Sequence, residues 1–238
     1  MSDRADRRRP DQIRPLDVVV DYLEQPHGSV LWSQGKTRVL CTATVEESVP
    51  RWMTGRGLGW VTAEYSLLPA STGQRTQREA SQGKQKGRTV EIQRLIGRAV
   101  RAAVDFKTLG ERTLWLDCDV LQADGGTRCA AICGSYVALA RALDRFGLSR
   151  ALSDSVAAVS LGIVGGRVLL DLDYVEDSSA DVDLNVVMMG DGRIVEVQAT
   201  AEQVAFAREQ LDELLDLGTR GIGLLARKQQ EVLDVARS

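Results

Sequence analysis

The sequence contains few of the residues from which many catalytic sites are built. Its 238 residues include one histidine, His27, four cysteines and only 5% aromatic residues. A zinc site with several histidines and a Cys₂His₂ finger therefore lack ligands, and a Ser-His-Asp relay could form only around His27. Charged residues are plentiful, with 30 basic and 33 acidic side chains. We therefore expect chemistry based on carboxylates, arginines, backbone amides or Mg²⁺.

Long apolar runs are also missing. No segment approaches the roughly 18 uninterrupted apolar residues of a membrane span. The first twelve residues, MSDRADRRRPDQ, lack the apolar core of a secretion signal. The four cysteines lie in apolar runs, as reduced and buried thiols do. We therefore expect a cytoplasmic protein with no membrane partner.

The net charge of −3 hides an uneven distribution along the chain. Residues 1–108 carry an excess of lysine and arginine, whereas residues 109–238 carry an excess of aspartate and glutamate. Such asymmetry indicates a surface that faces a polyanion next to an acidic one, or a chance distribution of solvated charge. Both interpretations stay open on charge alone.

Strand-like and helix-like periodicity alternate along the chain. Beta-branched residues and turns predict strands at 17–23, 28–34, 37–47, 59–69 and 112–122, and hairpins at 157–174 and 184–200. Apolar stripes predict helices at about 89–103, 128–146, 201–217 and 219–236. This order favours a mixed α/β (α+β) fold with mainly antiparallel pairing and packed helices. No stretch resembles a linker, so we expect one domain over 1–238 with a flexible N-terminus at 1–10.

A long polar segment, residues 71–88, precedes the first expected helix, and Ala80 is its only apolar residue. A loop of this length inside a domain is usually functional or disordered. On the helix that follows, Arg94, Arg98 and Arg101 have the spacing of residues that share one face. That face either contacts a polyanion or is a solvated surface.

A glycine-rich turn, Gly125 and Gly126 followed by Thr127 and Arg128, stands between an expected strand and an expected helix. Glycines let backbone amides approach an anion, and the start of a helix favours negative charge. The threonine hydroxyl and the guanidinium group suit phosphate oxygens. Arg88 stands at a second helix start. These residues indicate a phosphate site, and a simple tight turn is the alternative.

Six carboxylates occur within a short run after an expected strand. They are Asp171, Asp173, Glu176, Asp177, Asp181 and Asp183. Such a cluster repels itself unless it binds a cation or some of its members take up protons. Its spacing does not match an EF-hand loop. Coordination of Mg²⁺, general-acid catalysis and an acidic turn exposed to water are three interpretations of this run.

Several long motifs resemble bacterial ribonuclease PH, a family related to polynucleotide phosphorylase and to the exosome ring subunits. They include RRPDQIRP (8–15), GWVTAEYSLLP (59–69), EIQRLIGRAVRA (91–102), LGERTLWLDCDVLQADGGTR (109–128) and DLDYVEDSSADVDLNVVM (171–188). The resemblance implies the fold of the second domain of ribosomal protein S5 and a homohexameric ring built as a trimer of dimers. It also implies a phosphorolytic 3′→5′ exoribonuclease that trims precursor tRNA, with inorganic phosphate as co-substrate and nucleoside diphosphates as products.

The resemblance also assigns site residues. Phosphate would bind at Arg88, Gly126, Thr127 and Arg128, and Asp177 and Asp183 would be the catalytic, Mg²⁺-associated carboxylates. Asp183 would protonate the leaving 3′ oxygen, or both aspartates would hold Mg²⁺, and the sequence does not decide between these roles. The arginines expected to contact RNA are Arg75 and Arg78 in the polar loop, and Arg94 and Arg98 on the basic helix face.

One departure from the family pattern concerns RNA contact. Ala70 stands where the family commonly has arginine, which puts tRNA affinity or the placement of the polar loop in question. Two other functions compete with phosphorolysis. A non-catalytic RNA-binding ring subunit would be expected to lack some of the site residues, and all are present here. A hydrolytic nuclease with two metal ions would leave the phosphate-binding turn without a role.

Overall fold

The first sheet is built from strands in which apolar and polar residues alternate. The computed structural model describes residues 4–202 and 205–237. Five strands lie in the order β1-β2-β3-β5-β4. They are β1 (Leu16–Val20), β2 (Gly28–Gln34), β3 (Thr37–Glu46), β4 (Trp60–Leu67) and β5 (Thr113–Gln122). All neighbours are antiparallel except β4 and β5, which pair in parallel. In β3 every second residue is buried, so one face of this sheet covers the core.

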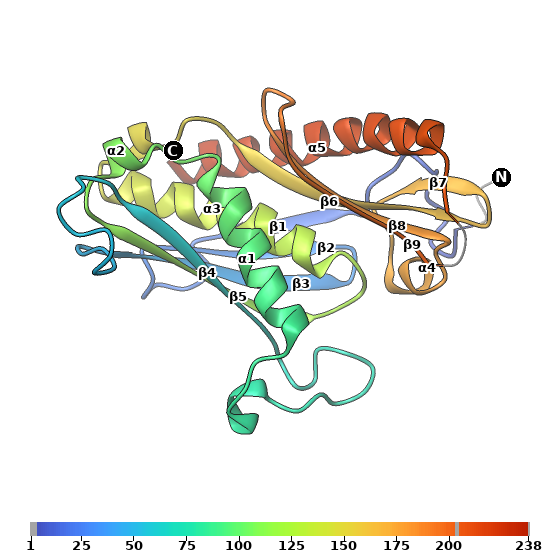
Figure 1. Cartoon of the computed structure of the whole chain (residues 1–238), viewed down its shortest axis with the longest axis horizontal. Coiled ribbons are helices and arrows are strands. Elements are labelled where there is room, and N and C mark those ends of the chain that lie inside the picture. The colour runs from blue at the N-terminus through green and yellow to red at the C-terminus, as the bar shows by residue number, and fades with distance from the viewer. Residues whose placement is uncertain (1–3, 203–204, 238) are drawn as a thin grey trace.

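A second sheet of four strands, in the order β7-β6-β8-β9, is antiparallel throughout. Its strands are β6 (Val156–Val164), β7 (Arg167–Leu170), β8 (Val182–Met189) and β9 (Ile194–Ala201). In β6 both faces are buried along almost the whole strand. The reason is that helices cover both sides of this sheet (Figure 1).

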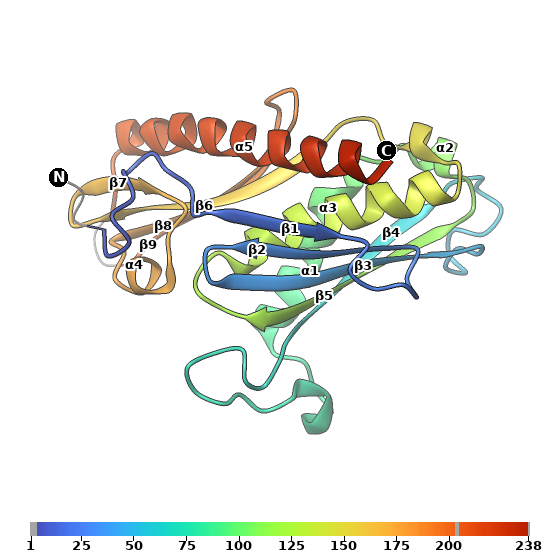
Figure 2. The same ribbon diagram turned by 180° about the vertical axis from the view of Figure 1, so that it is seen from behind.

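Three long helices complete the layers. They are α1 (Gly87–Arg101), α3 (Thr127–Arg145) and α5 (Arg208–Arg237). Helix α3 lies between the two sheets, α1 packs beside it on β4, and α5 covers the outer side of β6 and β8 (Figures 1 and 2). The short helices are α2 (Phe106–Leu109), α4 (Tyr174–Ser178), η1 (Glu79–Gln82) and η2 (Ser149–Ala151). The mixed α/β fold predicted from the sequence is confirmed.

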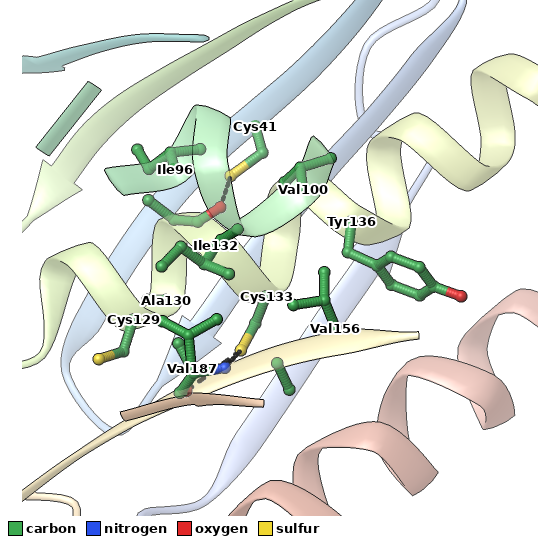
Figure 3. Close-up of a cluster of buried hydrophobic side chains, with 14 of the residues drawn as sticks. Cys41, Ile96, Val100, Cys129, Ala130, Ile132, Cys133, Tyr136, Val156 and Val187 are labelled. Atoms are coloured by element: carbon green, nitrogen blue, oxygen red, sulfur yellow. Dashed lines mark hydrogen bonds between the residues drawn. The ribbon is translucent and has the colours of Figure 1, made fainter. Parts of the chain in front are cut away.

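Small residues let α3 fit between the sheets. Sixteen of its nineteen residues are buried. A Cβ atom at Gly134 would lie 2.7 Å from Cys41 Sγ, so only glycine allows this close packing on β3. Figure 3 shows the surrounding cluster, in which the Cys41 thiol donates to the Ala131 carbonyl. All four cysteines are buried and unbonded to one another, as expected, and burial raises the pKa of Cys133 to about 12.

Two predictions about the ends of the chain differ from the structure. The helices expected at 201–217 and 219–236 are one helix, α5, which begins only at Arg208, after β9 has ended at Ala201. Residues 203–204 of the expected helix lie outside the described residues. The expected break at Gly218 is absent because this glycine serves packing: a Cβ atom there would lie 2.9 Å from Val186 Cγ1. Of the N-terminus expected to be flexible at 1–10, residues 1–3 lie outside the described residues, and Arg4 and Arg8 are buried. No helix within 4–202 and 205–237 has the length and apolar character needed to cross a membrane.

The shared position of α3 gives a prediction about stability. Because one buried helix contacts both sheets and one hydrophobic cluster runs from β2 to α5, we expect the chain to unfold as a single cooperative unit. Scanning calorimetry should give one transition whose calorimetric and van't Hoff enthalpies agree. Two separate transitions would contradict the single-domain organisation.

Candidate functional site

A cavity of about 620 Å³ opens where the first turns of α1 and α3 meet α4 and the start of β8. Its lining contains eight of the residues singled out in the sequence: Arg75, Arg88, Gly125, Gly126, Thr127, Arg128, Asp177 and Asp183. Ser160, Tyr174 and Asn185 also line it. Arginines and carboxylates from distant parts of the chain therefore face one space.

The glycine-rich turn lies at the start of α3, where two consecutive residues have left-handed backbones. Gly125 and Gly126 have φ values of +74° and +63°. A Cβ atom on Gly125 would lie 2.7 Å from the backbone of Leu172 and Asp173, so the turn packs directly against the segment that leads into α4. Gly126 is the N-cap of α3, and no side chain caps this helix. Its first amides are therefore available to an anion.

The hydroxyl of Thr127 is held from the first sheet. Tyr65 on β4 shares a buried hydrogen bond of 2.8 Å with the Thr127 hydroxyl. Burial raises the pKa of Tyr65, so its phenol stays protonated at neutral pH. The bond fixes the position of Thr127 Oγ1 at the edge of the cavity.

The two predicted phosphate arginines differ in how they are held. Arg128 donates to Gln198 Oε1 on β9 at 2.9 Å and lies 3.6 Å from Glu91 on α1, so its guanidinium is fixed on two sides. Arg88 is exposed in the first turn of α1. The positive charges of both arginines act on Asp177 and Asp183 across the cavity. The cavity therefore has one predicted phosphate arginine held in place, Arg128, and one that is exposed, Arg88, next to its two carboxylates.

Local hydrogen bonds place the two aspartates. Asp173 and Glu176 form a capping box at the start of α4, and this short helix brings Asp177 to the cavity. Asp183 stands at the second position of β8. Burial, with a further contribution from the Asp177 charge, raises the pKa of Asp183 to about 6. Burial also raises the pKa of Asp177, against the opposing charges of Arg128 and Arg88.

The donor set can be compared with what Mg²⁺ requires. Among the described residues no group of three or more histidine, cysteine, aspartate or glutamate side chains is placed to hold a metal ion. Mg²⁺ commonly binds proteins through one or two carboxylates and keeps waters or substrate phosphate oxygens as its other ligands. Asp177 and Asp183, partly buried and without a direct salt bridge in the described part of the chain, fit such a site. The Mg²⁺ site stays a prediction.

The four arginines predicted to contact RNA do not lie together. Arg75 lines the cavity, whereas Arg78 lines a neighbouring one that also contains Asp117 and Asp119 on the first sheet. On α1, Arg98 forms two hydrogen bonds with Glu196, of 2.7 and 2.8 Å, beside the exposed Arg94. RNA contact by these side chains stays a prediction, and at Arg98 it would compete with an existing ion pair.

Sequence reasoning missed residues that lie in or beside the cavity. The buried Ser160 hydroxyl lines it close to Gly126 and has no hydrogen-bond partner among the described residues. Ser160 is the only polar side chain in the apolar run of β6, and this is the one signal in the sequence that distinguishes it. Asn185, in contrast, ends the acidic run that was already singled out, and its amide donates to Asp183 at 3.4 Å.

Solved structures define the class of fold. The chain superposes on rice (Oryza sativa) Rrp46 with a TM-score of 0.80 at 19% identity, covering 97% of this chain and 100% of that one. It superposes on a chain of the Archaeoglobus fulgidus exosome with RNA bound to the active site, with a TM-score of 0.79 at 24% identity and coverage of 96% and 91%. The fold is therefore that of the exosome proteins.

Sequence comparison gives the family. Models of the 3′ exoribonuclease family match residues 12–143 (domain 1) and 154–221 (domain 2). A protein named Ribonuclease PH from Syntrophomonas wolfei is 55% identical, with 98% of this chain and 100% of that protein covered. Another of the same name, from Bacillus pumilus, is 53% identical, with 96% and 97% covered. The chain belongs to the ribonuclease PH family of 3′ exoribonucleases.

The raised pKa of Asp183 predicts that ionisation of this carboxyl lowers the free energy of unfolding. Its folded-state pKa of about 6 exceeds the ordinary value of 3.8, so the folded state binds more protons and stability falls as pH rises from about 4 to about 6. Above that range the cost is constant. In buffer with a chelator, we expect Asp183→Asn to raise the melting temperature at pH 8 by roughly 5–10 °C, with the difference vanishing near pH 4.

The matched control is Asp216→Asn on the exposed surface of α5, which should move the melting temperature little at either pH. Equal melting temperatures of Asp183→Asn and the unchanged protein at pH 8 would show that Asp183 titrates normally.

Proposed function

We propose that this chain is a phosphate-dependent 3′→5′ exoribonuclease that shortens RNA 3′ ends, including those of precursor tRNA. The observation that carries the proposal is the convergence of Arg88, Thr127 and Arg128 with Asp177 and Asp183 in one cavity. Relatives at 53–55% identity named Ribonuclease PH support it. Retention of this whole set speaks against a non-catalytic RNA-binding ring subunit.

Inorganic phosphate would bind between the two arginines and the start of α3. The guanidinium groups of Arg88 and Arg128, the Thr127 hydroxyl and the backbone amide of Gly126 all match phosphate oxygens. Placing the nucleophile there fixes it beside the terminal nucleotide, and the positive groups offset repulsion between two anions. The buried Ser160 hydroxyl is a further donor available at this position.

In the reaction, a phosphate oxygen attacks the phosphorus that links the last two nucleotides. The new bond joins the two phosphorus groups through that oxygen, and the bond to the 3′ oxygen of the penultimate nucleotide breaks. The products are a nucleoside diphosphate and an RNA shortened by one residue with a free 3′ hydroxyl. No histidine base is required because phosphate is already ionised at neutral pH.

The leaving 3′ oxygen needs a proton or a neutralising charge, and the two aspartates can supply either. A protonated Asp183 would donate its proton to that oxygen as a general acid. Alternatively Asp177 and Asp183 would hold Mg²⁺, which when bound supplies a positive charge that offsets the developing negative charge on the oxygen. Neutral Asp183 and a bound cation exclude each other, so dependence on added Mg²⁺ distinguishes them.

We also propose a homohexameric ring, a trimer of dimers, in the cytoplasm. The support is the likeness to exosome chains together with four buried thiols typical of a reducing compartment. Precursor tRNA and inorganic phosphate would be its substrates. Arg78, which lies outside the cavity lining, would then be available to ring assembly or to RNA.

The first prediction concerns the products. The protein is incubated with a tRNA bearing extra 3′ nucleotides and Mg²⁺, with and without inorganic phosphate. We expect nucleoside diphosphates only when phosphate is present, as resolved by chromatography. Nucleoside monophosphates formed without phosphate would identify a hydrolytic nuclease, and no product in either case would favour the scaffold role.

The second prediction concerns Arg88. Because Arg88 contributes charge to the phosphate position, Arg88→Ala should reduce phosphorolysis by about a hundredfold or more, with RNA affinity changed by less than about threefold in a filter-binding assay. Arg220→Ala on α5, an exposed arginine outside the cavity, is the control and should behave as the unchanged protein. An equal loss of RNA binding would show that Arg88 holds RNA instead of phosphate.

The ring is tested by sedimentation. We expect a particle of six chains, each of 26.0 kDa, at the concentrations where phosphorolysis is measured. Full activity from a species that sediments as a monomer would refute the hexamer as the functional form.

A further inference from the structure

Three arginines from the N-terminal segment are buried behind the cavity: Arg4, Arg8 and Arg14. Figure 2 shows this segment passing beside β7 and α4 before it enters β1. None of the three is among the residues that line the cavity. A buried guanidinium is costly unless its donors are satisfied, so their partners show what the segment holds in place.

Arg14 joins two segments that are distant in sequence. Its guanidinium donates to both oxygens of Asp171, at 2.7 and 3.0 Å, and its backbone amide donates to the same carboxylate at 2.7 Å. The other side of the guanidinium donates to the carbonyls of Asp124 and Gly125, immediately before the N-cap of α3. One side chain therefore fixes the orientation of the phosphate-binding turn relative to Asp171.

Thr37 on β3 supports the same turn and is itself in contact with Arg14, whose guanidinium donates to the Thr37 hydroxyl at 3.5 Å. This hydroxyl donates to the Gly125 carbonyl at 2.7 Å and accepts from the Asp124 amide at 3.0 Å. The Gly125 carbonyl thus has two donors, one charged and one neutral. Both point this peptide group away from the cavity and leave the amides at the start of α3 facing the anion position.

The backbone of Asp171 is also held in place, at the start of the segment that leads to Asp177 and Asp183. Asp171 has a left-handed backbone with φ +56°, and its amide donates to the Ser160 carbonyl. Arg4 and Arg8 donate to its carbonyl. Although burial acts to raise it, the charge and hydrogen bonds of Arg14 hold the pKa of Asp171 below its ordinary value. This carboxylate therefore stays ionised and keeps its partner in place.

The segment after Asp171 connects the glycine turn to α4. Leu172 and Asp173 touch the glycine turn, and Asp173 caps the helix that presents Asp177. Arg4 also forms two hydrogen bonds of 2.7 Å with Glu176. The phosphate-binding turn and the aspartate helix thus share one buried support.

We propose that Arg14 is a positioning residue for phosphorolysis, holding the Asp124–Gly126 turn in its phosphate-binding conformation through the buried Arg14–Asp171 ion pair. It does not touch substrate. The inference rests on the proposed function and adds to it a residue outside the cavity that determines phosphate affinity. Lysine cannot replace it fully, because one ammonium group cannot reach the carboxylate and both carbonyls in the geometry of the planar fork.

The test compares Arg14→Gln with Arg141→Gln in the full-length protein. Arg141 is also a buried arginine in an ion pair, with Asp21 at 2.9 Å, and it contacts neither the glycine turn nor Asp171. Binding of inorganic phosphate is measured by calorimetry, and KM is measured separately for phosphate and for RNA. We expect Arg14→Gln to weaken phosphate binding and raise its KM by about tenfold or more, with KM for RNA within about twofold.

Arg14→Lys should recover part of the phosphate affinity, and Arg141→Gln should retain nearly all of it. Equal phosphate affinity of Arg14→Gln and the unchanged protein would refute the inference, as would an equal loss in Arg141→Gln. If the unchanged protein binds no phosphate, the proposed function fails first, and the two failures are distinguishable.

Thr37→Val decides the question if Arg14→Gln does not fold, as judged by circular dichroism. It removes the second support of the same peptide group without leaving a buried charge unpaired. We then expect a severalfold rise in KM for phosphate and an unchanged KM for RNA. An unchanged KM for phosphate would refute the idea that the orientation of this turn controls phosphate binding.

Discussion

The burial of α3 between two sheets is the constraint on which the rest of the structure depends. A helix in this position needs small side chains, and it has them where it meets β3, as at Gly134. Its first turn, at Gly126 and Thr127, faces the cavity. The helix that completes the hydrophobic core therefore also directs an uncapped N-terminus at the place where we propose that phosphate binds.

Each half of the sequence supplies a different kind of charge to that place. Arg88 and the glycine turn come from the range matched by the first family model, and Asp177 and Asp183 come from the range matched by the second. Arg128 is held by one residue from each range, Glu91 on α1 from the first and Gln198 on β9 from the second. The acidic net charge is thus compatible with binding polyanions, because the opposite charges are sorted in space.

Much of this arrangement was predictable from the sequence. Strand alternation predicted most of the sheets, and glycine turns, arginines and clustered carboxylates pointed to the residues that share the cavity. Gly218 was misinterpreted as a helix break because periodicity does not show what a glycine packs against. A charged segment such as 1–10 predicts a flexible end, because its sequence does not show the distant partners that allow burial. Here Glu176 pairs with Arg4, and the Asp171 carbonyl accepts from Arg8. The position of Arg78, outside the cavity lining, could not be predicted, because the spacing of residues along a loop does not determine the path of its backbone.

The support behind the glycine turn also bears on when the enzyme becomes active during its synthesis. Arg14 leaves the ribosome early, but its partner Asp171 is followed by Asp177, Asp183 and finally Gln198, all needed for the finished cavity. A nascent chain that contains only the first sheet, α1 and α3 would present basic side chains without an ordered phosphate site. The proposed phosphate site is therefore complete only after the chain has been made as far as Gln198 on β9.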